Sequence, residues 1–391
     1  MKNNTFFCHL TGQCVSAIAT FILFGDEYKN ILEKIFIPKG KTKQITDTTI
    51  LHGLIKSNNL IYDEAVIKIH TKTPAFPHFT YCEINVHGSP GIISALKKLF
   101  KSLNIHEVTK AGFLQYAFRK KYITYLEKEL YHELFDNYSK KYTQLLLEEK
   151  RKTFLEHIKE NIDNISYLIN FLTSLLKKFT ILKKFKKPVK VGIFGSTNAG
   201  KSTLFNCLLN TNRAITSPLP GTTRDYISSI LHLKDYSIEF LDTAGFWESD
   251  DFINLKTKEI TKKLWDSKNM LKLLVFAYDA PIPQELKFTD ENTILVYNKI
   301  DVKELNNISP NSRKNIIQVS ALKNINIDVL LDEIKKVIKI NDWLNLSSPI
   351  IFTKRHEILI NRMLQLLKNN VKSNLKFILD EIETGNKEYF A

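Results

Sequence analysis

Cysteines are few in this chain of 391 residues, and their spacing matches no metal-binding or disulfide-rich pattern. Cys8, Cys14, Cys82 and Cys207 form no CxxC pair and have no histidine at ligand spacing. The sequence therefore predicts neither a zinc site nor a disulfide framework. A reducing compartment such as the cytoplasm fits this composition.

Long hydrophobic runs are also lacking. No segment approaches the ~18 consecutive apolar residues of a membrane span, so we expect no membrane association through a helix. The apolar run 15–24 follows Gln13, precedes Gly25-Asp26 and has no small-residue cleavage pattern. It is predicted to be a buried strand rather than the core of a signal peptide.

Acidic residues are outnumbered, with 41 Asp and Glu against 56 Lys and Arg, which gives a formal charge of +15. An anionic partner would feel an attractive field, and nucleic acid is the commonest such partner, with membrane surfaces the other. The alternative is that a chain rich in Lys, Asn and Ile reflects genome composition. Hydrophobic residues at 43% favour a folded protein of two or three domains over disorder.

Four segments follow from the patterning. Residues 1–118 combine short apolar runs with turn signals, which is typical of a small α+β domain. Residues 119–186 contain no Gly or Pro and repeat apolar residues at helical spacing, which predicts long amphipathic helices. Residues 187–340 alternate β-rich and helical runs, and residues 341–391 return to helices at 354–367 and 371–383.

The third segment predicts a doubly wound, largely parallel sheet, because short strands alternate with helices. Its expected strands are 189–194, 227–233, 238–241, 271–278, 293–297 and 316–319. Because helical segments flank this α/β domain on both sides, we expect them to pack together as one helical domain into which the α/β domain is inserted.

A phosphate-binding loop stands at the start of the α/β domain. Residues 195–202 read Gly-Ser-Thr-Asn-Ala-Gly-Lys-Ser, match GxxxxGKS and lie between a predicted strand and a predicted helix. The glycines allow backbone N–H groups to wrap phosphates, Lys201 can reach the β- and γ-phosphates, and the Ser202 hydroxyl can hold Mg²⁺.

Further motifs follow in the order that guanine-nucleotide proteins use. Pro-Gly-Thr-Thr-Arg-Asp occupies 220–225, and Asp-Thr-Ala-Gly at 242–245 places a carboxylate near the metal and a glycine N–H near the γ-phosphate. Asn-Lys-Ile-Asp at 298–301 supplies Asp301 to accept from guanine N1–H and N2–H, which adenine lacks. Ser-Ala-Leu at 320–322 can present N–H groups to guanine O6. The motifs predict GTP and GDP as ligands rather than ATP.

With these motifs in order, the chain resembles the MnmE (TrmE) family of tRNA modification GTPases. Outside the nucleotide domain, Glu-Ile-Asn-Val-His-Gly at 83–88 is similar to the family's E-x-x-x-H-G segment, and Ala117-Phe118 falls where its G-E-F-T-x-R-A-F motif ends. Arg355-His356 also fits the family pattern. The resemblance covers nearly the whole chain. The match is strong in the nucleotide domain and weak in the segments on either side of it.

The resemblance implies a P-loop GTPase domain (187–340) inserted in a helical domain (119–186 and 341–391). A folate-binding-like dimerisation domain (1–118) precedes them. It further implies a cytoplasmic homodimer, hydrolysis of GTP that depends on Mg²⁺ and K⁺, a flavoprotein partner of the MnmG type, and modification of the tRNA wobble uridine of the carboxymethylaminomethyl type. Ser202 and Thr223 would hold Mg²⁺. Asn198, Ser217, Leu219 and Thr222 would hold K⁺, which would stand in for an arginine finger.

Taken together, motifs and resemblance predict one set of guanine-nucleotide contacts. These are Asn198, Ala199, Gly200, Lys201, Ser202, Thr203, Ser217, Thr222, Thr223, Asp242, Thr243, Ala244, Gly245, Asn298, Lys299, Asp301, Ser320, Ala321 and Leu322.

Departures from the family pattern weaken two of its properties. The family's folate-contacting arginine aligns with Ile22 and its lysine falls near Tyr122, so Glu83 alone remains, with Lys120 and Lys121 close enough to substitute. The family's catalytic glutamate aligns with Asn254, which predicts slow hydrolysis and leaves the catalytic residue unassigned. Acidic side chains lie nearby in a loop, at Glu248, Asp250 and Asp251. The sequence also ends at Ala391 without the Cys-Ile-Gly-Lys tail that is typical of the family.

Two alternatives accompany this function. The chain could be a GTP-switched binding module that has lost the modification chemistry, or a ribosome-assembly GTPase, although no KH-type GxxG segment follows the nucleotide domain. Lysine pairs at 177–178, 183–184 and 186–187 could neutralise tRNA phosphates or form the wet face of an amphipathic helix.

Overall fold

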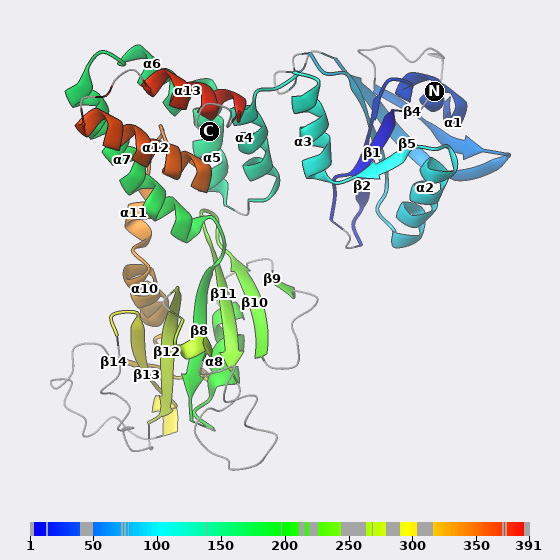
Figure 1. Cartoon of the computed structure of the whole chain (residues 1–391). Helices are drawn as coiled ribbons and strands as arrows, with labels where there is room; N and C mark the ends of the chain where they lie inside the picture. Colours follow the sequence, from blue (N-terminus) through cyan, green and yellow to red (C-terminus); the bar gives the residue numbers. More distant parts are fainter. Residues whose placement is uncertain are drawn as a thin grey trace. The chain divides into compact units, whose positions relative to one another are not determined.

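The computed structural model describes residues 4–12, 15–39, 50–71, 73, 76, 78–137, 139–196, 198–210, 216–218, 226–243, 263–267, 269–278, 290–302, 316–369, 371 and 374–386. The chain divides into two compact units, residues 1–136 with 372–391 and residues 137–371 (Figure 1). Each unit is described by itself.

The first unit is built on a seven-stranded sheet with the order β3-β4-β5-β6-β2-β1-β7. All neighbours are antiparallel except β1 and β7, which are parallel. The strands are β1 (Thr5–His9), β2 (Ile18–Gly25), β3 (Phe36–Pro38), β4 (Ile50–Ser57), β5 (Leu60–His70), β6 (Tyr81–His87) and β7 (His106–Val108). The predicted strand at 15–24 is thus confirmed as β2.

Helices cover both faces of this sheet because consecutive strand residues point to opposite sides. On one face lie α1 (Tyr28–Ile35) and α2 (Pro90–Ser102), whose Phe100 packs 5.0 Å from Phe7 and 5.8 Å from Phe21 between ring centroids. On the other face α3 (Lys110–Arg119) places Phe113 5.1 Å from Phe24. Figure 1 shows α2 and α3 on opposite sides of β1.

Residues 119–186 are helical, as expected, but they form three short helices and one long helix. They are α4 (Tyr125–Phe135), α5 (Lys140–Arg151), α6 (Phe154–Glu160) and α7 (Ile165–Phe185). Each begins at a side chain that accepts a hydrogen bond from the first turn, at Thr124, Ser139, Thr153 and Asn164. Such caps start a new helix without any Gly or Pro. α4 packs with α13 (Leu375–Thr384), which begins four residues later than predicted.

Among the described residues, α7 is long and apolar enough to cross a membrane, judged by length and composition alone. The sequence predicts no such segment, because it contains no run of ~18 consecutive apolar residues. The buried stripe Leu168, Leu172 and Leu175 packs α7 against α12 (Lys354–Lys368), and the core helix of a folded domain passes the same test.

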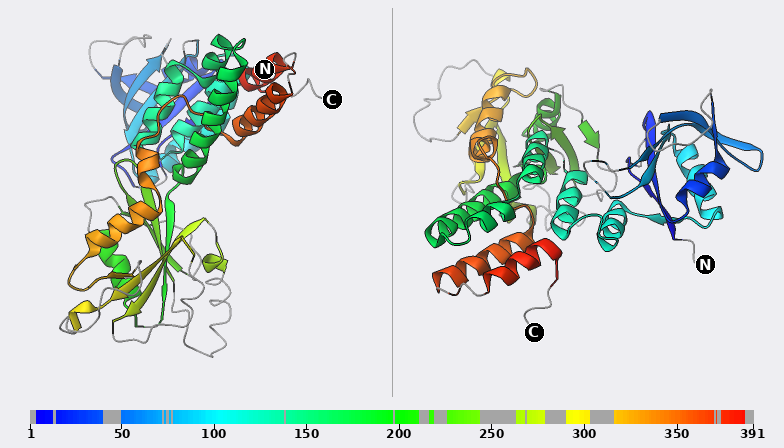
Figure 2. Two further views of the ribbon diagram at one scale, coloured as in Figure 1. Left: turned by 90° about the vertical axis from the view of Figure 1, so that its left-hand side faces the viewer. Right: turned by 90° about the horizontal axis from the view of Figure 1, so that it is seen from above.

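The second unit contains a seven-stranded sheet with the order β14-β13-β12-β8-β11-β10-β9. The five strands from β14 to β11 are parallel, and β10 and β9 are antiparallel. The strands are β8 (Val189–Gly195), β9 (Thr216–Pro218), β10 (Tyr226–His232), β11 (Ser237–Thr243), β12 (Met270–Ala277), β13 (Thr293–Asn298) and β14 (Ile316–Gln318). Figure 2 shows the twist of this sheet.

All six predicted strands of the α/β domain are present, and β9 is an addition. Helices α8 (Lys201–Asn210), α10 (Ile327–Val337) and α11 (Ile340–Leu344) accompany the sheet. The expected mixed α/β nucleotide domain is therefore confirmed. The four-part domain division, the insertion into one helical domain and the nature of the N-terminal domain remain predictions.

Candidate nucleotide-binding site

The phosphate-binding loop joins β8 to α8 and contains two positions that require glycine. Gly195 has φ +147°, and a Cβ there would lie 2.0 Å from the carbonyl oxygen of Val275. Gly200 has φ +85°, and its Cβ would lie 2.3 Å from Nδ2 of Asn298. The neighbouring strands β12 and β13 therefore approach the loop so closely that a side chain cannot fit at either glycine.

Lys201 begins α8, and its side chain folds back over the loop. Its Nζ donates a hydrogen bond of 2.8 Å to the Ser196 carbonyl, and the residue is buried. The ammonium group thus lies over the turn whose N–H groups precede a helix, where phosphates bind. Ser202 and Thr203 follow on the first turn of α8 and are exposed.

Asp242 lies near the end of β11, where it is the register partner of Ile193 in β8. Burial raises the pKa of its carboxyl group, while a hydrogen bond from Ser202 and the charge of Lys201 lower it. Its Oδ1 atom is buried and has no hydrogen-bond partner in the described part of the chain. A buried carboxylate oxygen left without a donor beside a serine hydroxyl fits the hydration shell of a Mg²⁺ ion.

Asn298 links the phosphate-binding loop to the segment after β14. Its Nδ2 donates to the carbonyls of Ala199 at 3.0 Å and Gly200 at 3.4 Å, and its Oδ1 accepts from the Ala321 N–H at 3.0 Å. The side chain is almost fully buried. The sequence motif indicated base recognition here but not this bridge, because its partners lie far away in the sequence.

Asp301 lies in the 3₁₀ helix η2 (Ile300–Val302) and is held by Ser320. The Ser320 hydroxyl donates to Asp301 Oδ1 at 2.5 Å and accepts from the Lys323 N–H at 3.1 Å. The hydrogen bond from Ser320 is the largest influence that lowers the pKa of Asp301. The carboxylate is therefore ionised and oriented, as an acceptor for two N–H groups of a base should be.

The backbone of the Ser-Ala-Leu segment is already partly engaged. The Ser320 N–H donates to Ile325 at 3.1 Å, and the Ala321 N–H is bound by Asn298. Among the described contacts the Leu322 N–H has no protein acceptor, so of the three predicted amides it is the one not engaged within the protein. Lys299, which has φ +66°, is partly exposed beside Gly200.

A hollow of about 340 Å³ lies between α8 and this segment. Thr203, Ala321 and Leu322, all predicted contacts, line it. Cys207 also lines it and donates a hydrogen bond from Sγ to Asn324 Oδ1 at 3.3 Å. Cys207 is not among the predicted nucleotide contacts, because nothing in its local sequence pattern marks it.

Several predicted site residues cannot be located. Outside the described residues lie Leu219, Thr222, Thr223, Ala244, Gly245, Glu248, Asp250, Asp251 and Asn254. Ser217 and Thr243 are placed only by their strand positions in β9 and β11. Of the predicted K⁺ ligands, the structure therefore describes the side chain of Asn198 alone, which is exposed and has φ +62°.

Glu83, the predicted folate contact, lies on β6 opposite Ile22 of β2. Its carboxylate interacts with His70 Nε2 at 2.8 Å and accepts from Asn85 Nδ2 at 2.8 Å. Tyr122, near the other family position, stacks on Phe79 with centroids 5.0 Å apart. Glu83 therefore has protein partners on both oxygens, and its role toward folate remains a prediction.

Three of the lysines at the end of α7 serve internal packing. Lys178 donates to the carbonyls of Ser347 at 2.8 Å and Pro349 at 3.1 Å. Lys183 pairs with Glu357 at 2.9 Å, and Lys186 donates to the carbonyl of Phe352 at 2.8 Å. These bonds favour the structural interpretation of this lysine cluster over contact with tRNA.

Comparisons with known proteins agree with the motifs. Residues 190–320 match the family model described as 50S ribosome-binding GTPase. The tRNA modification GTPase MnmE of Aquifex aeolicus (strain VF5) is 26% identical over 90% of this chain and 86% of its own length. That of Thermoanaerobacter sp. (strain X514) is 28% identical over 96% of this chain and 91% of its own.

Among solved structures, a crystal structure of Aquifex aeolicus Era bound to GDP and AlF₄⁻ is 29% identical. It covers 43% of this chain and 60% of its own, with a TM-score of 0.32. The curated relatives extend over both units and beyond the nucleotide domain. The chain is a divergent member of the MnmE family of tRNA modification GTPases.

Proposed function

We propose that this protein binds GTP with Mg²⁺ and hydrolyses it to support modification of the wobble uridine in tRNA. The observation that carries the proposal is the Asn298 bridge. One buried amide ties the phosphate-binding loop to the Ser320-Ala321 segment, which in turn holds Asp301. The phosphate end and the base end of a guanine nucleotide are thus recognised by one connected set of side chains.

The hydrogen-bonding groups for the nucleotide are already in position in the protein without ligand. Phosphate oxygens would replace the Ser196 carbonyl as acceptors for Lys201, at a helix N-terminus that favours negative charge. Asp301 would accept from guanine N1–H and N2–H. Because adenine offers neither donor in that arrangement, an ionised Asp301 would be left unpaired by ATP.

The residues around Asp242 fit a Mg²⁺ ion, with Ser202 as a direct ligand and Asp242 acting through a water molecule. Thr223 is proposed as the second hydroxyl ligand. When bound, Mg²⁺ neutralises charge that develops on the β- and γ-phosphate oxygens. In the described residues no cluster of three or more His, Cys, Asp or Glu side chains could hold a metal ion.

For K⁺ we propose Asn198 as the side-chain ligand, with Ser217, Leu219 and Thr222 beside it. A cation at this position adds positive charge where the transition state accumulates negative charge. Asn254 aligns with the family's catalytic glutamate, and an amide is a poorer acceptor for the attacking water than a carboxylate. We therefore propose slow hydrolysis.

Family membership also supports a cytoplasmic homodimer that works with a flavoprotein partner of the MnmG type. These assignments rest on the relatives. The same holds for the tRNA substrate. Folate remains the weakest of the proposed ligands, because Glu83 is the single matching contact.

Nucleotide preference is the direct test. The purified protein should bind labelled GTP saturably and bind ATP at least ~10⁴-fold more weakly, since ATP offers no matching donors to the ionised carboxylate of Asp301. Asp301→Asn should lose affinity for GTP and gain affinity for xanthosine triphosphate, because the 2-carbonyl of xanthine accepts a hydrogen bond from the new amide. Equal affinity for GTP and ATP would overturn the proposal. Complementation of a strain lacking the wobble modification then tests the tRNA role.

A second candidate function is a GTP-switched binding module without modification chemistry, which Asn254 in the place of a glutamate favours. Tight GTP binding, background turnover in both K⁺ and Na⁺, and failed complementation by the folded protein would together select it. Turnover raised by K⁺, with restored modification, would exclude it.

A further inference from the structure

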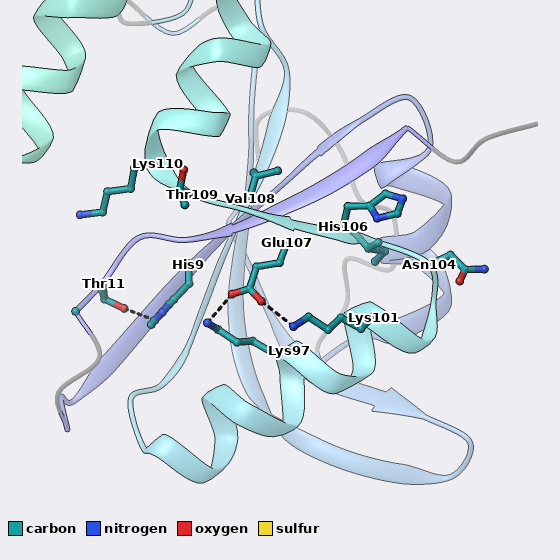
Figure 3. Close-up of a pocket in the computed structure, with 12 residues that line it drawn as sticks. His9, Thr11, Lys97, Lys101, Asn104, His106, Glu107, Val108, Thr109 and Lys110 are labelled. Carbon is teal, nitrogen blue, oxygen red and sulfur yellow. Dashed lines mark hydrogen bonds and ion pairs between the residues drawn. The ribbon is translucent and has the colours of Figure 1, made fainter.

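A cleft of about 890 Å³ lies in the first unit. It is bounded by the end of β1, the edge strand β7, the α2 helix and the start of α3 (Figure 3). Lys97, Lys101, Lys110, His9 and His106 line it, and Glu107 is its one acidic residue. None of these residues belongs to a motif that the nucleotide site or the predicted folate contact uses.

The cleft lies at the β7 edge of the sheet and takes side chains from both of its faces. Glu107 pairs with Phe7 on the α2 face, whereas His106, its neighbour on β7, pairs with Phe6 and points to the other face. Glu83 lies on β6, which is separated from β7 by β2 and β1 in the sheet order. A ligand in this cleft would therefore lie at a different part of the sheet from a ligand at Glu83.

Glu107 does not cancel the positive charge of the cleft. Its carboxylate is shared by Lys97 at 2.6 Å and Lys101 at 3.0 Å, which lowers the pKa of Glu107. Lys110 adds a further charge at the rim. Counting only these four residues, three ammonium groups face one carboxylate, so the lining keeps a net positive charge that attracts anions.

The side chains that line the cleft suit the phosphates of a nucleic acid backbone better than they suit the bases. Apart from its two histidines it contains no aromatic side chain on which a base could stack, and stacking is what single-stranded base recognition uses. Figure 3 shows His9 and Lys110 at one end of the cleft and His106 and Asn104 at the other, with Lys97 and Lys101 converging on Glu107 between them. An open groove with charged groups along its length suits a strand rather than a single small anion.

We propose that this cleft binds the phosphate backbone of an RNA strand, with Lys97, Lys101 and Lys110 as the phosphate contacts. The proposal rests on the proposed function, which makes tRNA the RNA concerned. The α7 lysines are the competing basic cluster, and Lys178, Lys183 and Lys186 are bound within the protein. Two of the cleft lysines are also paired, with Glu107, so the preference for the cleft rests on its shape and not on unpaired charge. The cleft lysines remain positioned along a groove.

The test compares two triple variants of the full chain. Lys97→Ala/Lys101→Ala/Lys110→Ala empties the cleft of ammonium groups. Lys29→Ala/Lys34→Ala/Lys98→Ala removes the same charge from exposed positions of the same unit, and Lys98 is the neighbour of Lys97 on α2. Binding of fluorescent bulk tRNA is measured by anisotropy from 50 to 200 mM KCl, with circular dichroism and GTP affinity as checks of folding.

We expect the cleft variant to bind tRNA at least ~10-fold more weakly than wild type at 50 mM KCl. We expect its slope of log affinity against log salt to be shallower by about 2 to 3, one per lost phosphate contact. The control variant should stay within about threefold of wild type. Lys110→Ala alone, which leaves the Glu107 pairs intact, should lower the slope by about one and covers the case in which the triple variant does not fold.

Three outcomes would overturn the inference: no tRNA binding by wild type at 50 mM KCl, equal losses in both triple variants, or loss of inorganic phosphate binding with tRNA binding unchanged. The last outcome would identify a small-anion site. GTP preference and turnover are measured separately in the second unit, so a failed proposed function and a failed RNA cleft give different results.

Discussion

Trp343 and Asp235 are joined by a hydrogen bond of 2.8 Å from the indole Nε1 to the backbone carbonyl. The Ser139 hydroxyl donates to the same oxygen at 2.6 Å. Asp235 lies in the turn between β10 and β11, and β11 leads to Asp242 in the nucleotide site. Trp343 is fully buried and stacks on Phe185 at 5.3 Å. α5 and α11 therefore fix the end of the hairpin that is remote from the nucleotide.

Shortening Trp343 should separate its two contributions to stability. Trp343→Phe keeps a buried ring but loses the hydrogen bond, and should cost roughly 1 kcal/mol of unfolding free energy. Trp343→Ala should cost about 3–5 kcal/mol because it also leaves a cavity. Urea denaturation measures both, with the exposed neighbour Leu344→Ala as control. Equal losses for Trp343→Ala and Leu344→Ala would contradict this packing.

Asn298→Ala should weaken nucleotide binding by breaking the bridge between the phosphate-binding loop and the Ser320-Ala321 segment. The change removes the Nδ2 group that donates to the carbonyls of Ala199 and Gly200, and it leaves the Ala321 N–H without its acceptor. We expect GTP affinity to fall at least tenfold, equivalent to about 1.4 kcal/mol, with faster nucleotide release in stopped-flow measurements. Asn341→Ala, at an exposed position of α11, is the control. Wild-type release rates in Asn298→Ala would rule out the bridge.

Glu149 should make stability depend on pH. It is fully buried in α5 and accepts from the N–H groups of Phe154 and Ile350 and from the Ser348 hydroxyl. Burial raises its pKa from 4.5 to about 7. Because the folded protein then holds the proton more tightly than the unfolded chain, the free energy of unfolding falls as pH rises from about 4.5 to about 7.

Glu149→Gln should remove this contribution. The effect is at most about 1.4 kcal/mol per unit of pKa difference. Thermal melts between pH 5 and 8 should show a smaller loss of Tm toward high pH in Glu149→Gln than in wild type. The exposed neighbour Glu148→Gln should follow wild type. Identical pH profiles for wild type and Glu149→Gln would show that this carboxyl group does not titrate as argued.

Asn198 should decide the response to monovalent cations. Wild-type turnover of GTP should be faster in KCl than in NaCl, because K⁺ at Asn198 adds charge near the reacting phosphate. Asn198→Ala should lose this difference while GTP affinity changes by less than about threefold. Single-turnover assays in the two salts measure it. A K⁺ response that survives in Asn198→Ala would place the cation elsewhere.

The six strands predicted for the nucleotide domain are present because each is a short apolar run, and all of them except β12 stand next to a motif. Sequence reasoning predicted that residues 119–186 are helical but not where one helix ends and the next begins. Those breaks come from capping side chains such as Thr124 and Thr153, not from Gly or Pro.

The sequence by itself determined which residue types meet the nucleotide, because the phosphate-binding loop and the base-recognition motif are each contiguous. Only the tertiary structure decided how these motifs are joined. Asn298 and Ala199 are 99 positions apart and meet because β13 and β8 belong to one parallel sheet. The same holds for charge, since the fold engages the lysines of α7 in internal bonds and arranges those of α2 and α3 along a cleft. Local sequence patterns determine which functional groups a segment carries, whereas the strand order determines which of these segments lie next to one another.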